Sequence, residues 1–173
     1  PSNADIANAF GVNTSMLSHT FDVVIVGAGP AGLGAAVYAA SEGLDALVVD
    51  REVFGGQAGS SSLIRNFLGF PAGISGAALA TRAYEQAWLF GAKFHFMHGV
   101  TALRAGTREH TTVLSDGTEL RSRAVVVATG VTYRRLGIPS LEAFRGLGVF
   151  YGAAVSEARA VEGQQVIVAG DHL

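Results

Sequence analysis

The sequence contains no cysteine among its 173 residues. Such a chain can form neither a disulfide bond nor a thiolate metal site, and it cannot itself carry dithiol redox chemistry. The five histidines are scattered without the spacing of metal ligands, and they are His19, His95, His98, His110 and His172. We therefore predict no metal site and interpret each histidine as a surface or strand residue.

Charge of either sign is also scarce, because 15% of the residues are charged and the formal net charge is −2. Without a cluster of basic residues, the chain lacks the electrostatic footprint of a nucleic-acid-binding protein. Its longest apolar runs have the length of a β-strand and are too short to cross a bilayer. No secretory signal or transit peptide is visible, so we expect a cytoplasmic protein without nucleic-acid or membrane partners.

Glycine, by contrast, is abundant, with 23 residues, and the most informative ones follow the first apolar run. Residues 21–26 read Phe-Asp-Val-Val-Ile-Val and lead into the pattern Gly27-x-Gly29-x-x-Gly32. A run of small residues typical of a helix starts at Pro30. In this context the first glycine permits a tight turn and the second lets a pyrophosphate approach the backbone. The third lets helix and strand pack closely.

An acidic residue completes this unit. A second apolar run, 46–49, is followed by Asp50, which lies about 20 residues beyond the glycines, where an acid accepts hydrogen bonds from a ribose. The N-terminus of the intervening helix attracts phosphates through its free N–H groups and its dipole. Residues 21–50 thus predict a dinucleotide-binding βαβ unit. An ordinary βα unit with unrelated glycines is the less favoured alternative.

The rest of the sequence predicts further α/β structure with a small antiparallel insertion. In chain order, we expect a glycine- and serine-rich loop at 54–62 and a helix at 76–90 capped by Ser75. A meander of short strands follows at 93–98, 100–105, 111–114 and 119–121, with a turn at Asp116-Gly117. We then expect a fully buried strand at 124–130 that ends in glycine, and a last strand at 166–169 before Gly170. Three apolar runs thus end in a glycine, which indicates two nucleotide-binding units in series.

Taken together and in order, these motifs resemble those of the thioredoxin reductase-like flavoproteins, a branch of the pyridine nucleotide–disulfide oxidoreductase superfamily. The matching segments are Val24–Gly32, Gly55–Gln57, Ile64–Pro71, Ala128–Gly130 and Leu136–Pro139. The resemblance implies a Rossmann-like FAD-binding domain with three layers, a parallel sheet and a small antiparallel β-meander insertion. The start of a second, truncated NAD(P)-binding domain would follow.

The resemblance also implies a division of the chain. Residues 1–20 would form a linker with a short helix, residues 21–145 the N-terminal part of the FAD-binding domain, and residues 146–173 the connection into the truncated NAD(P)H-binding domain. A less favoured alternative is that Gly170-Asp171 represents the C-terminal flavin-binding motif of the family, joined after a deletion.

By the same resemblance, the first glycine motif binds FAD, and no side chain acts as an acid, base or nucleophile. The implied contacts are Gly27, Gly29, Pro30, Ala31 and Gly32 at the pyrophosphate, Asp50 and Arg51 at the adenosine ribose, Gly56 and Gln57 along the ribityl chain, Asn66 near the flavin ring, the backbone of Gly99 and Val100 at the adenine, and Ala128, Thr129 and Gly130 over the cofactor.

The sequence departs from thioredoxin reductases proper, because the redox-active Cys-x-x-Cys pair would fall at Gly152 and Val155. It is therefore closer to a cysteine-free branch. We expect an FAD-dependent oxidoreductase that passes electrons from NAD(P)H through FAD to an unidentified acceptor, a protein or a small molecule, without an internal disulfide.

Several alternatives stay open at this point. One is a non-catalytic FAD-binding module, or a fragment of such a reductase. A plain NAD-binding dehydrogenase domain is less favoured, because it needs neither Gly55-Gly-Gln57 nor Ala128-Thr-Gly130. The sequence does not decide between NADH and NADPH as the electron donor. The oligomeric state is also open, and the resemblance suggests a homodimer.

Overall fold

A computed structural model of the chain describes residues 19–133, 135–144, 148–151 and 161–169. The chain divides into two compact units, residues 1–130 and 131–173. Each unit is described by itself. The domain boundary after residue 145 that the resemblance implies stays a prediction.

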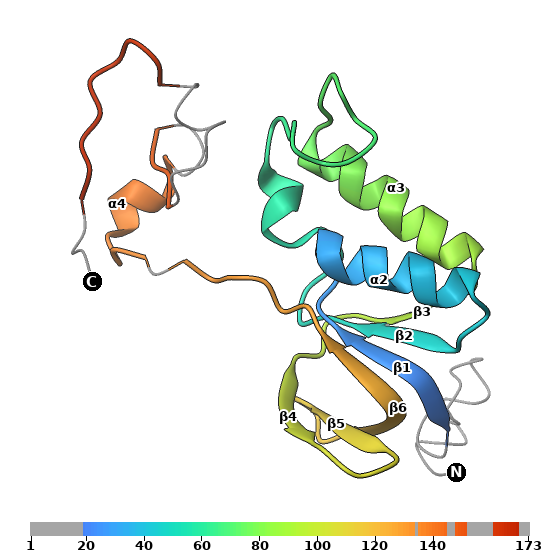
Figure 1. The fold of residues 1–173 in the computed structure, drawn as a ribbon. Helices are drawn as coiled ribbons and strands as arrows, with labels where there is room; N and C mark the ends of the chain where they lie inside the picture. The colour runs from blue at the N-terminus through green and yellow to red at the C-terminus, as the bar shows by residue number, and fades with distance from the viewer. Residues whose placement is uncertain (1–18, 134, 145–147, 152–160, 170–173) are drawn as a thin grey trace, which may run out of the picture. The chain divides into compact units, whose positions relative to one another are not determined.

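The first unit is built on a six-stranded sheet with the strand order β3-β2-β1-β6-β5-β4 (Figure 1). Its strands are β1 (Thr20–Val26), β2 (Ala46–Val49), β3 (Lys93–His95), β4 (Val100–Arg104), β5 (His110–Leu114) and β6 (Glu119–Val127). β1 pairs in parallel with β2 and with β6, and β2 pairs in parallel with β3. β4 and β5, and β5 and β6, pair antiparallel. The carboxyl ends of β1, β2 and β6 therefore meet at one edge of the sheet, where α/β folds bind their ligands.

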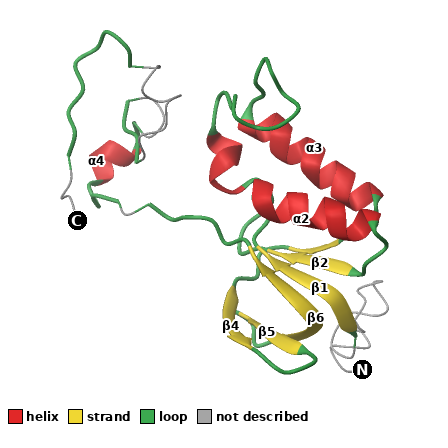
Figure 2. Cartoon of the chain, in the orientation of Figure 1, coloured by secondary structure: helices red, strands yellow, loops and turns green. Residues whose placement is uncertain are grey.

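Two helices, α2 (Pro30–Ser41) and α3 (Gly76–Leu89), lie on the same side of this sheet (Figure 2). Both predicted helices are confirmed. The Ser75 hydroxyl accepts a hydrogen bond from the Ala78 N–H at 3.2 Å and so caps α3. Gly43 and Gly91 follow the two helices with φ angles of +79° and +97°, which only glycine adopts without strain.

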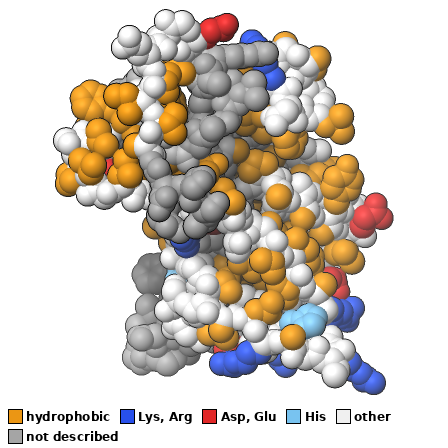
Figure 3. Space-filling model, turned by 60° about the vertical axis from the view of Figure 1, so that its left-hand side comes forward, with side chains coloured by type: hydrophobic (Ala, Val, Ile, Leu, Met, Phe, Trp, Pro, Cys, Tyr) orange, Lys and Arg blue, Asp and Glu red, His pale blue; other side chains and the backbone are white. Residues whose placement is uncertain are grey.

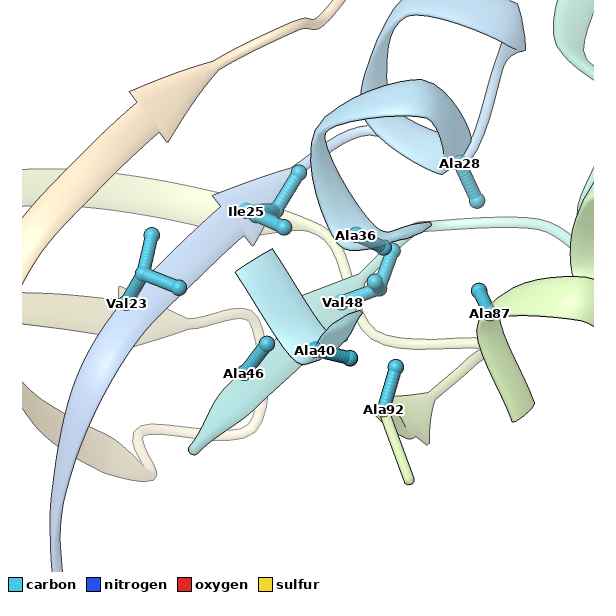
Figure 4. Packing of buried hydrophobic residues seen from close by; sticks show 9 residues of the cluster. All are labelled: Val23, Ile25, Ala28, Ala36, Ala40, Ala46, Val48, Ala87 and Ala92. Carbon is cyan, nitrogen blue, oxygen red and sulfur yellow. The ribbon is translucent and has the colours of Figure 1, made fainter. Parts of the chain in front are cut away.

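Small side chains fill the space between the helices and the sheet. In the cluster drawn in Figure 4, alanines from α2, α3 and the segments beside them meet Val23 and Ile25 of β1 and Val48 of β2. Because alanine adds only a methyl group, the helices approach the sheet closely and their backbones are held near the ends of the strands. The start of α2 is thereby fixed relative to β1 and β2.

The opposite face of the sheet is covered by the antiparallel meander. Leu114 of β5 and Leu120 of β6 pack against side chains of the parallel strands, namely Phe21, Val24 and Leu47. All five side chains are almost completely buried. The unit therefore has three layers, with helices, a mainly parallel sheet and a meander. This arrangement confirms the predicted Rossmann-like α/β fold class.

Three details of the predicted elements are wrong. Residues 93–95 form β3, a parallel edge strand beside β2, and do not belong to the meander. The strands expected at 119–121 and 124–130 belong to one strand, β6, which pairs with β5 through residues 119–122 and with β1 through residues 121–127. The loop expected at 54–62 contains a short 3-10 helix, η2 (Gly56–Ser60). Alternation shows that a strand exists but does not identify its partner.

The prediction of a fully buried strand at 124–130 is also wrong. Val126 and Val127 are 38% and 65% exposed. Among the described residues, the helix-side core contains side chains of β1 and β2 and none of β6, so they do not cover β6 on both faces in the way that a central parallel strand is normally covered. On the face drawn in Figure 3, apolar side chains are common and charged ones few, as the composition leads one to expect.

The second unit contains one short helix among its described residues, α4 (Pro139–Glu142). The Glu142 carboxylate accepts hydrogen bonds from the Tyr151 hydroxyl at 3.0 Å and from Arg135 at 3.3 Å. The strand predicted at 166–169 is wrong, because these residues form no ladder with any described segment and Ile167 and Val168 are 93% exposed. Gly170, where that strand would end, lies outside the described residues. Within the described part of the chain, no helix is long and apolar enough to cross a membrane.

Candidate functional site

The turn after β1 brings the first glycine against the end of β6. The Gly27 N–H donates to the Val49 carbonyl oxygen at 2.8 Å, and Gly27 has a φ of +109°. A side chain at Gly27 would overlap the carbonyl oxygen of Ala128, whose own N–H donates to the Val26 carbonyl oxygen at 2.8 Å. Glycine is therefore required here both by the turn and by the close approach of the two chain segments.

The other two glycines of the motif have different surroundings. A Cβ on Gly32 would overlap the carbonyl oxygen of Gly27, so Gly32 lets α2 pack directly on the turn. A Cβ on Gly29 would meet no atom within 4 Å. Gly29 has an ordinary extended backbone, with φ −76°. Neither backbone conformation nor protein packing thus calls for glycine at this position, and the open space fits the expected approach of a pyrophosphate.

The N-terminus of α2 borders this open space. Gly29 is its N-cap residue, Pro30 its first helical residue, and no side chain caps it. Proline lacks an N–H group, so the first-turn donors are those of Ala31 and Gly32. Together with the positive end of the helix dipole, these backbone groups provide a site that favours a diphosphate anion.

Asp50 connects the glycine turn to the end of β2. Its carboxylate accepts a hydrogen bond from the Ala28 N–H at 2.6 Å and another from the Glu52 N–H at 2.9 Å. Each carboxylate oxygen has a second lone pair, so the same group can also accept hydrogen bonds from ribose hydroxyls. The structure places Asp50 beside the glycine turn, and its contact with a ribose stays a prediction.

The residues expected at the adenosine end lie next to Asp50. A Cβ on Gly99 would lie 3.4 Å from the Cβ of Arg51. The His98 N–H donates to the Asp50 carbonyl oxygen at 3.1 Å, and Val100 begins β4 and packs on the meander-side core. Sequence positions about 50 residues apart therefore converge at one end of the site.

The glycine-rich segment after β2 lies against the other end of the turn. The Gly55 N–H donates to the Ala28 carbonyl oxygen at 2.8 Å. Gly56, with a φ of +55°, approaches so closely that a Cβ on it would be 3.2 Å from the Cα of Gly29. Gln57 follows on η2 with its side chain exposed. The backbone of this segment thus borders the same open space as the start of α2.

The remaining expected residues are less closely connected to this centre. Thr129 and Gly130 follow β6 and are exposed. Asn66 lies in a loop closed by the bridge between Ile64 and Ile74, where residues 65–71 line an open hollow. Among the hydrogen bonds of the described residues, none joins Asn66 to the glycine motif. Its role near the flavin ring stays a prediction.

Sequence reasoning missed a histidine pair beside Asp50. The rings of His95 and His98 stack with centroids 4.4 Å apart, and His98 Nε2 lies 3.4 Å from the Asp116 carboxylate. Burial, followed by the charge of His98, lowers the pKa of His95 below its ordinary value. The three-residue spacing alone did not indicate this pairing, because it depends on a tight turn between the two residues.

Comparison with known proteins identifies the family. The family profile for pyridine nucleotide-disulphide oxidoreductases matches residues 21–170. The chain belongs to this family. It is 34% identical over 150 residues to a thioredoxin reductase of Bacillus subtilis, covering 87% of this chain and 46% of the relative. It is 40% identical over 138 residues to a thioredoxin reductase of Mycolicibacterium smegmatis, covering 80% of this chain and 43% of the relative.

Solved structures agree with this assignment. The crystal structure of thioredoxin reductase from Streptococcus pyogenes superimposes with a TM-score of 0.68 at 31% sequence identity, covering 75% of this chain and 41% of that one. The family resemblance drawn from the motifs is thus confirmed. The chain spans a little under half the length of the curated relatives it matches.

Proposed function

We propose that the first unit binds FAD across the glycine turn and that the whole protein is an FAD-dependent NAD(P)H oxidoreductase. The observation that carries this proposal is the open space at Gly29, bordered by the N-terminus of α2 and by the backbone of Gly55 and Gly56. The thioredoxin reductase relatives use FAD and NADPH. Backbone donors and small residues around an open position suit the diphosphate of a long, flat ligand.

Different residues of the chain would bind different parts of FAD. The Ala31 and Gly32 N–H groups would bind the diphosphate, and Asp50 would accept hydrogen bonds from the adenosine ribose. Gly99 and Val100 would border the adenine, with Arg51 beside them. Gly56 and Gln57 would follow the ribityl chain. Thr129, Gly130 and Asn66 would lie toward the flavin, which places the reactive end away from Asp50.

When bound, FAD would supply the redox chemistry, accepting a hydride from the nicotinamide and releasing electrons to an acceptor. The protein would contribute position and exclusion of water. In this proposal residues 21–145 form the N-terminal part of the FAD-binding domain, and residues 146–173 lead into the domain that binds NAD(P)H, within a protein of the cytoplasm.

The acceptor is proposed to be a separate molecule. The chain has no cysteine, and Gly152 and Val155, which stand where the resemblance expects the redox pair, lie outside the described residues. Electrons would then leave the flavin directly for a partner of the thioredoxin class or for a small molecule. The same absence supports a second candidate function, a non-catalytic FAD-binding module.

Absorbance spectroscopy tests the proposal. FAD added to the purified full chain should stay with the protein after gel filtration and show the bands of protein-bound flavin. The variant Gly29→Val should fold and lose FAD, because its side chain would occupy the diphosphate position. Gly34→Val is the matched control, since Gly34 also has no atom within 4 Å of its Cβ position but lies one turn further along α2. Equal FAD retention in both variants would contradict the site.

Reduction of the bound flavin by a nicotinamide cofactor distinguishes the two candidate functions. In a chain that includes the whole NAD(P)H-binding domain, NADPH or NADH added without oxygen should bleach the flavin bands if the protein is a reductase. Flavin that binds but stays oxidised under these conditions would favour the non-catalytic module.

A further inference from the structure

His98 occupies the junction of three chain segments at the expected adenosine end. Its backbone N–H donates to the Asp50 carbonyl oxygen at 3.1 Å. Its ring Nδ1 lies 2.9 Å from the Phe96 carbonyl oxygen, and Nε2 lies 3.4 Å from the carboxylate of Asp116, on the turn between β5 and β6. One residue therefore connects the end of β2, the β3–β4 connection and the meander turn.

Other backbone hydrogen bonds show that these segments are held against one another. The Asp50 N–H donates to the His95 carbonyl oxygen at 3.2 Å, and the Ser115 N–H donates to the Gly99 carbonyl oxygen at 2.7 Å. Met97, between the two histidines, has a φ of +67°, which is unfavourable for a residue with a side chain. Such a conformation persists only where the surroundings hold it in place, and it is concentrated near functional sites.

We propose that His98 is a positioning residue for cofactor binding. Through its contact with Asp116, it keeps Asp50 and Gly99 in fixed positions relative to each other. The inference rests on the proposed function, because it assigns those two residues to the ribose and the adenine. His98 itself need not touch the ligand. Its contribution is that the Asp50 main chain and the Gly99 backbone are ordered before the ligand arrives.

The ring of His98 supplies both side-chain contacts of this link. One ring nitrogen lies 2.9 Å from the Phe96 carbonyl oxygen, and the other lies 3.4 Å from the Asp116 carboxylate. His95 stacks on the same ring, and its buried Nε2 has no hydrogen-bond partner among the described residues. The charged residues of the segments that meet here are Asp50, Arg51 and Glu52 after β2 and Asp116 on the meander turn.

The test uses the full chain and two ligands, FAD and ADP-ribose. ADP-ribose carries the adenosine end without the flavin, and its esterified diphosphate does not titrate near neutral pH. His98→Ala should weaken both ligands about threefold to fivefold, the size expected for a partly exposed charged contact. Asp116→Asn should have a similar effect. Glu119→Gln, which removes the exposed ion pair with Arg104 on the same meander, should leave both affinities unchanged.

Two further readouts separate positioning from a general structural role. His98→Gln retains a side-chain N–H donor, so the affinity for both ligands should be largely restored relative to His98→Ala. Without ligand, amide hydrogen exchange at Asp50, His98 and Ser115 should be faster in His98→Ala than in Glu119→Gln.

These outcomes distinguish the two proposals. A wild-type chain that binds neither FAD nor ADP-ribose would contradict the proposed function, while the exchange rates would still decide whether His98 orders this edge. Unchanged exchange and unchanged affinity in His98→Ala would overturn the positioning role. So would a His98→Gln variant that binds both ligands no better than His98→Ala.

Discussion

The Asp50 carboxylate accepts a hydrogen bond from the Ala28 N–H at 2.6 Å, although the two residues are 22 positions apart. Its other oxygen accepts from the Glu52 N–H at 2.9 Å. A single side chain therefore fixes both the glycine turn after β1 and the chain leaving β2. The acid that the motif assigns to a ribose also shapes the turn that is expected to bind the diphosphate, so stability and ligand binding depend on the same group.

Replacing Asp50 with asparagine should affect both properties. The amide can accept one of the two hydrogen bonds, but its NH2 group would face the other backbone donor. We expect the free energy of unfolding to fall by about 1–3 kcal/mol, the usual effect of leaving a partly buried donor unpaired. FAD retention should fall as well. Urea unfolding and flavin absorbance measure the two effects.

Asp22→Asn is the matched control for this variant. The Asp22 carboxylate accepts from the Asp45 N–H at 2.9 Å and from Arg123 at 3.1 Å, and it lies near the start of β1. The Asp22→Asn variant should have a similarly lowered free energy of unfolding, but it should retain FAD. If both variants lose flavin equally, Asp50 acts only through stability.

The second prediction compares two glycines of α2, one packed against backbone and one facing open space. Gly32→Ala places a methyl group onto the Gly27 carbonyl oxygen, and we expect a loss of about 3 kcal/mol or more, because backbone atoms must move. Gly34→Ala adds the same methyl group within the helix where no atom lies within 4 Å. It should raise stability by about 0.5–1 kcal/mol, the usual gain for alanine in a helix. Similar unfolding free energies for the two variants would contradict the packing role of Gly32.

Local features of the site could be predicted from the sequence, and long-range ones could not. The roles of Gly27 and Gly32 follow from a turn between a strand and a helix that are adjacent in sequence, and the structure agrees with both. The partner of β3 could not be predicted, since the sequence of a three-residue strand does not identify the strand that it joins. Nor could the stack of His95 on His98, because it depends on the left-handed backbone of Met97.

The backbone of Met97 gives a third prediction. Met97 is 69% exposed and has a φ of +67°, so its side chain contributes little packing while its conformation is unfavourable by about 1–2 kcal/mol. Met97→Gly should therefore raise the melting temperature. Met97→Ala keeps the unfavourable conformation, because alanine also has a Cβ, and it should not exceed the wild type. Calorimetry on the three proteins decides between these results.

The fourth prediction concerns acid sensitivity. Burial, followed by the charge of His98, lowers the pKa of His95 below its ordinary value of 6.5. As pH falls below about 6.5, the unfolded chain binds a proton that the folded chain resists, so the free energy of unfolding should decrease. Asp45 and Asp116 also have lowered pKa values, but they do not change the stability near pH 6. For Asp116 the main cause of the lowered pKa is the hydrogen bond from the Thr118 N–H. The stability that these two carboxylates contribute is lost only below the ordinary pKa of 3.8.

Replacing His95 with phenylalanine isolates this effect. Phenylalanine keeps a ring against His98, does not titrate, and removes a buried nitrogen that has no hydrogen-bond partner among the described residues. Urea unfolding at about pH 7.5 and pH 5.5 should show a smaller acid loss of stability in His95→Phe than in the wild type. His110→Gln, which removes a histidine from β5, should leave most of the acid loss of stability in place. If instead His110→Gln removes the acid loss and His95→Phe does not, the site of protonation lies on the meander, and the histidine beside Asp50 remains neutral throughout this range.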